Sequence, residues 1–169
     1  MKSEATKKLT LSVVFVAIYV ASTAINPLGY GPLQFRISEL LLIIPFFDKR
    51  FIPGAIIAVA IANFFSPLGI IDVGIGVSIA VISYTLLIKI YNKYLLIIAY
   101  AILCGLIVGA GLHYVYEIPY FFNVGSIALS QLIIGLVSLY VIRQFIKVGV
   151  VEENATKKSR FEIKAEEMK

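Results

Sequence analysis

The sequence predicts an all-α membrane protein with six transmembrane helices and both termini in the cytoplasm. Hydrophobic residues make up 60% of the 169 residues, a share that is typical of chains crossing a membrane several times. Every Lys and Arg except Arg36 lies near a chain end or in one of two short connections between apolar runs. Because Lys and Arg in short loops favour the cytoplasmic side, this distribution fits an even number of crossings.

Apolar runs of about spanning length define the expected helices. The first run follows Lys7 and Lys8, and we interpret it as a retained helix rather than a signal peptide, because further apolar runs follow. The second and third runs are short and contain Pro45 and Pro53 near their junction, which predicts tilt, local thinning or a broken helix. The six expected helices cover about residues 8–26, 35–48, 51–66, 69–89, 94–116 and 122–146.

Two regions follow from this pattern: a six-helix membrane domain at residues 1–147 and a charged cytoplasmic tail at residues 148–169. The tail has mixed charges and few large apolar side chains, which is typical of loosely structured extensions. The net charge is +5. In a membrane protein, excess Lys and Arg usually mark the cytoplasmic side, so we do not interpret this charge as a sign of nucleic-acid binding. We expect membrane lipid to surround the six-helix domain.

The connections on the expected outer side contain no Lys or Arg and are rich in aromatic residues, Pro and Gly. Irregular backbone at membrane depth is tolerated only beside protein or a water-filled cavity, so we expect an outward-facing pocket on that side. Polar residues in the spans gather toward the same side, where they should face a cavity or each other. The candidate binding residues are Gln34, Arg36, Glu39, Asn63, Asp72, Glu117, Asn123 and Gln131, with the aromatic residues Tyr30 and Phe35.

Several of these residues allow two interpretations. Arg36 and Glu39 are three residues apart, so on one helical face they would either form a structural ion pair or present Glu39 to a ligand. Asp72 is either a binding residue or an interfacial side chain that reaches toward water. Glu117 is either a binding residue or a solvated loop residue. The outer aromatic residues either form an interfacial belt or stack on a planar ligand.

Enzyme and metal signatures are scarce. The chain contains neither a G-x-x-x-x-G-K-[ST] phosphate loop nor a G-x-S-x-G nucleophile turn. Its single His113 has no second imidazole or thiol cluster with which to bind zinc. Cys104 is the only cysteine, so it cannot form an intramolecular disulfide. We therefore expect no enzyme activity, no metal and no cofactor.

Small residues spaced four apart allow close approach of two helices. Ala17 and Ala21 have this spacing in the first expected helix, and Gly105 and Gly109 have it in the fifth. Packing inside the monomer explains either pair, and for the two glycines we prefer that explanation.

The run YGPLQFRISELLLIIPFF, followed by IPGAIIAVAIANFFSPLGIIDVGIG, resembles the QueT family of queuosine-precursor transporters, which are substrate-binding S components of energy-coupling factor (ECF) transporters. The resemblance covers roughly residues 8–90. It implies an S-component-like, multi-pass protein of the cell membrane that captures a micronutrient from outside. Beyond the fourth expected helix the chain departs from the family pattern at three positions, Cys104, Gly111 and Gln131. These departures leave the exact ligand open.

The resemblance also implies partners. An S component works with a transmembrane T component and two ATP-binding-cassette ATPases, which agrees with the missing phosphate loop. Members of this type dock on the T component through an A-x-x-x-A face of helix 1. Ala17 and Ala21 match that motif, and Ala24 extends it.

The implied ligand is a 7-deazaguanine such as pre-queuosine or queuine, which presents two adjacent N–H donors that one carboxylate can accept. Glu39 is our first choice for this acceptor, with Arg36 fixing it or donating to the ring carbonyl. Asp72 or Glu117 would neutralise an aminomethyl cation on the ligand. Orienting hydrogen bonds are assigned to Gln34, Asn63, Asn123 and Gln131.

Two other classes of function stay open on the sequence. The first is a stand-alone secondary carrier or channel for a small nucleobase-like or vitamin-like solute. The second is an intramembrane enzyme or an assembly scaffold.

Overall fold

The computed structural model describes residues 2–26, 29 and 35–151, and every regular element among them is helical. In chain order the elements are α1 (Lys2–Ala24), the 3-10 helix η1 (Ile37–Ile43), α2 (Ile44–Phe47), the 3-10 helix η2 (Lys49–Phe51), α3 (Ile52–Phe64), α4 (Ile70–Thr85), the 3-10 helix η3 (Leu87–Lys89), α5 (Lys93–Tyr116) and α6 (Tyr120–Lys147). The predicted all-α class is confirmed.

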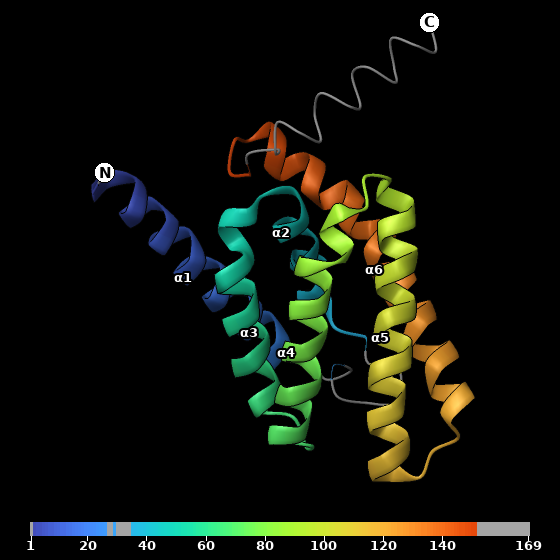
Figure 1. Ribbon diagram of the computed structural model, residues 1–169. Coiled ribbons are helices and arrows are strands. Elements are labelled where there is room, and N and C mark those ends of the chain that lie inside the picture. The colour runs from blue at the N-terminus through green and yellow to red at the C-terminus, as the bar shows by residue number, and fades with distance from the viewer. Residues whose placement is uncertain (1, 27–28, 30–34, 152–169) are drawn as a thin grey trace, which may run out of the picture.

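The long helices form a bundle (Figure 1). Helices α3, α4 and α5 lie side by side, α6 packs along α5, and α1 crosses α3 at a steep angle. The N-terminal half of α1 projects away from the other helices in this view. The short η1 packs against both α1 and α6, so it lies in the interior between the two sides of the bundle.

Membrane-spanning character is clearest in the second half of the chain. Three helical segments, Ile70–Lys89, Lys93–Tyr116 and Tyr120–Lys147, are long and apolar enough to cross a membrane, whereas Leu9–Ala24 and Ile37–Phe47 are shorter apolar helices. Length and composition therefore identify a membrane protein. The count of six crossings and the orientation of the termini stay predictions.

The expected break between the second and third helices is present. Pro45 and Pro53 each lie in the first turn of a short helix, where the missing N–H of proline costs nothing. Between these helices Asp48 has extended backbone (φ −133°, ψ 103°). Its carboxylate accepts the backbone N–H of Arg50 at 3.0 Å and pairs with the Arg50 guanidinium at 2.6 Å. The break is therefore a capped corner between α2 and α3.

The glycines of the G-x-x-x-G pair hold α5 close to α6. A Cβ atom at Gly105 would lie 2.8 Å from the Val124 carbonyl oxygen, and one at Gly109 would lie 3.0 Å from Val124 Cγ2. Both distances are too short for a larger side chain without movement of α6. The prediction that these glycines serve packing inside the monomer is confirmed.

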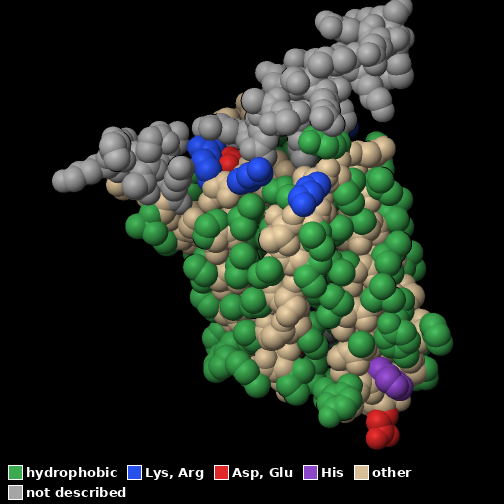
Figure 2. Space-filling model, in the orientation of Figure 1, with side chains coloured by type: hydrophobic (Ala, Val, Ile, Leu, Met, Phe, Trp, Pro, Cys, Tyr) green, Lys and Arg blue, Asp and Glu red, His purple; other side chains and the backbone are tan. Residues whose placement is uncertain are grey.

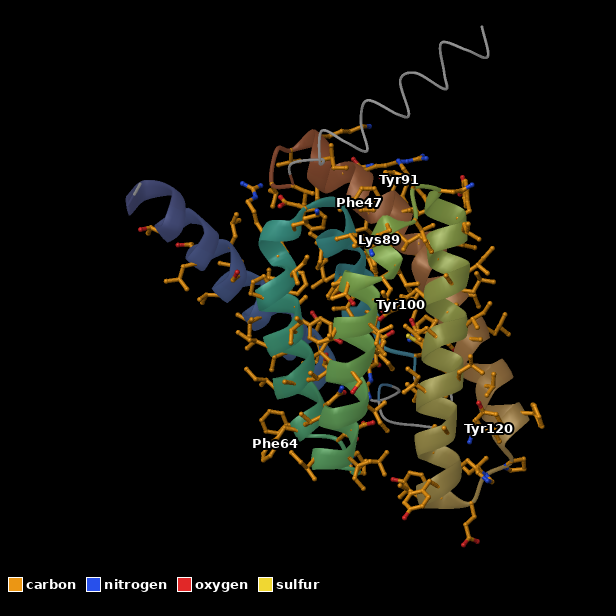
Figure 3. The ribbon with its side chains drawn as sticks, viewed as in Figure 1. Phe47, Phe64, Lys89, Tyr91, Tyr100 and Tyr120 are labelled. Atoms are coloured by element: carbon orange, nitrogen blue, oxygen red, sulfur yellow. The ribbon has the colours of Figure 1, made fainter. Side chains whose placement is uncertain are left out.

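The two ends of the bundle differ in character. In Figure 2 the Lys and Arg side chains gather at one end, a belt of apolar side chains follows, and the single His113 lies at the opposite end. Figure 3 labels Phe47 and Lys89 at the first end and Phe64 and Tyr120 at the other. This division of cationic and apolar surface is the one expected for a protein embedded in a bilayer.

The start of the predicted tail folds back onto α6. The backbone N–H groups of Val150 and Val151 donate to the Phe145 carbonyl at 3.1 and 3.4 Å, and the Val151 side chain is buried. The remainder of the predicted tail, residues 152–169, lies outside the described residues.

Candidate functional site

A cavity that opens to the surface lies between η1, α3, α4, α5 and α6. Its walls are largely apolar, with the aromatic side chains of Tyr19, Tyr84 and Tyr100 among them. Tyr100 lies about midway along the bundle in Figure 3. Five of the polar residues selected from the sequence line this one cavity: Arg36, Glu39, Asn63, Asp72 and Gln131.

The buried guanidinium of Arg36 connects three segments of the chain. Its Nε donates to the carbonyl oxygen of Gly29 at 2.6 Å, and its Nη1 donates to Oδ1 of Asn63. Its Nη2 lies 3.5 Å from Oδ2 of Asp72, and both side chains are about 5% exposed. Each of the three guanidinium nitrogens of Arg36 therefore has its own partner. Together these contacts tie the segment between α1 and η1 to α3 and α4.

Asp72 lies beside positive charge on two sides. It lies in the first turn of α4, where the positive end of the helix dipole favours a carboxylate, and it pairs with Arg36. Since only 3% of Asp72 is exposed, the interpretation of this residue as a water-reaching interfacial side chain is wrong.

Gly76 is a cavity residue that sequence reasoning missed. It lies on α4 and lines the cavity directly beside Asn63 of α3. A Cβ atom at Gly76 would overlap the Asn63 amide and would lie 2.8 Å from Cγ1 of Val59. Any larger residue would therefore displace the amide that Arg36 holds. The sequence offers the glycine itself as a signal, but Gly74 in the same helix has open space around it.

Glu39 faces the cavity from η1 and accepts a hydrogen bond from Nε2 of Gln131 on α6. The assumption of one helix through Arg36 and Glu39 is wrong, because Arg36 has extended backbone (φ −106°, ψ 113°) and directly precedes η1, but the Arg36 charge still acts on Glu39. The two side chains instead meet by lining the same cavity. Arg36 also forms an ion pair with Asp72, on a different helix.

A second, smaller cavity adjoins the first. The two share Glu39, Leu42, Tyr100 and Gln131 as lining residues, so the contact between Glu39 and Gln131 lies where they meet. The second cavity continues along the apolar side chains of η1, α2, α5 and α6, and Ser138 adds a hydroxyl.

Three of the other sequence-predicted residues, Asn123, Glu117 and Phe35, do not line these cavities. Asn123 on α6 is fully buried, and neither polar atom of its amide has a hydrogen-bond partner in the described part of the chain. Glu117 is exposed at the end of α5. Phe35 is half-buried, and its carbonyl oxygen accepts from Asn26 Nδ2 at 2.8 Å. The predictions for Tyr30 and Gln34 lie outside the described residues.

The small residues of α1 face away from the bundle. Phe15, Tyr19 and Thr23 are the buried side of this helix, and the Thr23 hydroxyl donates to Ser38 Oγ at 2.7 Å. The other side leaves a stripe of three exposed small residues: Ala17, Ala21 and Ala24.

Metal binding has no support within the described ranges, where no group of three or more His, Cys, Asp or Glu side chains could hold an ion.

Comparison with known proteins gives one family. The QueT transporter family matches residues 9–147. Over 69 residues the chain is 36% identical to the "Queuosine precursor transporter QueT" of Lactococcus lactis subsp. cremoris (strain MG1363), a similarity that covers 39% of this chain and 41% of that protein. No solved structure matches. Since the family match covers most of the chain, this protein belongs to the QueT transporter family, whose members are transporters and not enzymes.

Proposed function

We propose that this chain is the substrate-binding S component of an ATP-driven ECF importer and that its cavity binds a queuosine precursor. One observation carries the proposal: polar residues from η1, α3, α4 and α6 that are far apart in the sequence line a single, largely apolar cavity. A few convergent polar groups in an apolar cavity are the usual composition of a small-molecule site. The name of the Lactococcus relative supports the ligand class.

The contacts suggest how a 7-deazaguanine would bind. Glu39 supplies carboxylate oxygens for the two adjacent N–H donors of the ring, and Gln131 orients that carboxylate. Arg36 is held by Asn63 and Asp72, so its role is to fix the cavity wall, with its guanidinium beside the ring carbonyl. The side chains of Tyr84 and Tyr100 offer aromatic surface for the planar ligand.

We also propose six membrane crossings in the cell membrane, with both termini and the tail in the cytoplasm and the cavity open to the outside. The cationic end of the bundle supports this orientation, because Lys49, Lys89 and Lys147 are exposed there. Lys93 from α5 lies 5.6 Å from the Phe47 ring centroid, which places the end of α2 and the start of α5 at the same end of the bundle.

Binding by the purified protein tests the proposed function. Native mass spectrometry should find a 7-deazaguanine bound after purification, and calorimetry should show binding of pre-queuosine but not of adenine, whose ring edge lacks the second adjacent donor. Failure of pre-queuosine to bind would contradict the proposal. Uptake of pre-queuosine by liposomes that contain this chain alone, without ATPases, would favour a stand-alone carrier instead.

The exposed alanine stripe should dock the T component. Replacing Ala17 and Ala21 together with Leu should block assembly with a T component, because larger side chains prevent close helix approach. Ligand binding by the isolated protein should stay nearly unchanged, since both residues are exposed and lie outside the cavity. Co-purification with the T component and calorimetry measure the two effects.

The matched control changes two other exposed positions of α1, Val14 and Ile18, to Leu. This variant should assemble normally. If the alanine variant lost ligand binding as well as assembly, the stripe would serve the internal fold and not docking.

A further inference from the structure

The glycines of α5 face two different helices. Gly105 and Gly109 lie against α6, whereas a Cβ atom at Gly111 would overlap Cδ1 of Ile75 on α4 and would lie 3.7 Å from its Cγ1. Two residues of an α-helix turn through about 200°, so Gly111 faces away from the side on which Gly109 meets α6. The packing of α5 on α6 therefore does not explain the glycine at position 111.

Ile75 connects this glycine to the cavity. Ile75 lines the cavity, as does Val108 on the facing helix α5, but Gly111 does not. The Ile75 side chain points end-on at Gly111, because its terminal Cδ1 comes closer to the glycine than its Cγ1 does. A β-branched residue in a helix has one strongly preferred χ1 rotamer, so the terminal methyl is the part that moves when it is displaced. A side chain at position 111 would take the space of this methyl and push it toward the cavity.

Ile75 and Val108 lie toward one end of the cavity. Helix α4 begins shortly after Phe64 and α5 ends shortly before Tyr120, and Figure 3 shows both aromatic residues at the end of the bundle opposite the lysines. Glu39 lies toward the other end, where the first cavity meets the second. In a 7-deazaguanine the two adjacent N–H donors lie on the six-membered ring and position 7 lies on the five-membered ring. A ligand bound to Glu39 through its donors would therefore direct its 7-substituent toward Ile75 and Val108.

We propose that Gly111 determines how large a 7-substituent the cavity accepts, because it leaves room outside the cavity for the terminal methyl of Ile75. This inference rests on the proposed function and names the part of the site that distinguishes ligands by size. Gly111 contacts Ile75 and does not line the cavity, so it is a positioning residue. Its effect should be confined to the part of the ligand that lies beside Ile75.

Two ligands that differ only in the substituent test this inference: 7-deazaguanine and 7-aminomethyl-7-deazaguanine. By calorimetry, Gly111→Ala should bind the aminomethyl ligand at least about five-fold more weakly than the wild type, as expected when a packed site is overfilled. Its affinity for 7-deazaguanine should stay close to that of the wild type. The matched control Gly74→Ala, at a position where a Cβ atom meets no atom within 4 Å, should change neither affinity.

The outcomes separate this inference from the proposed function. Equal losses for the two ligands in Gly111→Ala, or no loss for either, would overturn the inference about size and leave the proposed function standing. Failure of the wild type to bind either ligand would overturn both.

Ile75→Val tests whether the effect passes through the methyl. Valine lacks Cδ1, the atom that a Cβ at position 111 would overlap. When it is measured in an Ile75→Val background, Gly111→Ala should therefore change the affinity for the aminomethyl ligand by no more than about two-fold, because the two positions are coupled through that atom. A loss as large as in the wild-type background would show that Gly111 does not act through Ile75 and would overturn the inference.

Discussion

Arg36→Met should lower the free energy of unfolding by about 3–5 kcal/mol, the usual cost of removing one partner from a buried ion pair. The substitution keeps an apolar stem of similar length but leaves Asp72 as a buried carboxylate without its guanidinium. It also removes the donors to Asn63 and to the Gly29 carbonyl. The segment between α1 and η1 would then no longer be bonded to α3 and α4 through Arg36. Thermal unfolding of the detergent-purified protein measures the change.

The double variant Arg36→Met with Asp72→Asn separates charge from packing. Neutralising Asp72 removes the unpaired buried charge, so the double variant should be more stable than Arg36→Met alone, and the two changes should not be additive. If the double variant were as unstable as the sum of the two single variants, the pair would not be coupled in the folded protein.

Gly76→Leu should reduce ligand affinity by roughly five- to 150-fold, which corresponds to about 1–3 kcal/mol for overfilling a packed site. The new side chain would overlap the Asn63 amide and approach Val59, and it would occupy part of the cavity that Gly76 lines. Calorimetry with 7-aminomethyl-7-deazaguanine measures the loss.

Gly74→Leu is the matched control, two residues earlier in the same helix. A Cβ atom at Gly74 meets no atom within 4 Å, and both substitutions replace a helical glycine by a good helix former. Gly74→Leu should therefore leave affinity unchanged. Similar losses in both variants would mean that the effect comes from α4 as a whole and not from filling the cavity.

The helices could be predicted from the sequence because their signals are local. Runs of apolar residues mark α4, α5 and α6 without knowledge of their neighbours, and Pro45 and Pro53 mark helix starts because proline lacks a donor. Some of the polar residues in the cavity could also be predicted, because a polar side chain in an apolar membrane-spanning segment normally faces the interior of the protein.

The pairing of these polar residues could not be predicted. Arg36 and Asp72 are 36 positions apart, and Glu39 and Gln131 are 92 positions apart, so only the packing of the helices brings them together. Sequence spacing instead favoured the local pair of Arg36 and Glu39, because it assumed one helix through both residues. The extended backbone of Arg36 removes that assumption.

The difference between Gly74 and Gly76 likewise depends on the tertiary structure. Both glycines belong to the same short pattern in the sequence, and only the position of Asn63 on the adjacent α3 shows which of them the cavity requires.

The central claim is that Glu39 in this cavity binds the ligand. Calorimetric titration of the wild-type protein and of Glu39→Gln with 7-aminomethyl-7-deazaguanine tests it most directly. The account predicts one ligand per wild-type chain and an affinity roughly five- to 150-fold lower in the variant, since the amide turns one acceptor oxygen into a donor that faces the ligand's own N–H. Unchanged affinity in a folded Glu39→Gln protein would contradict the account and reduce the contact between Glu39 and Gln131 to a structural link between η1 and α6.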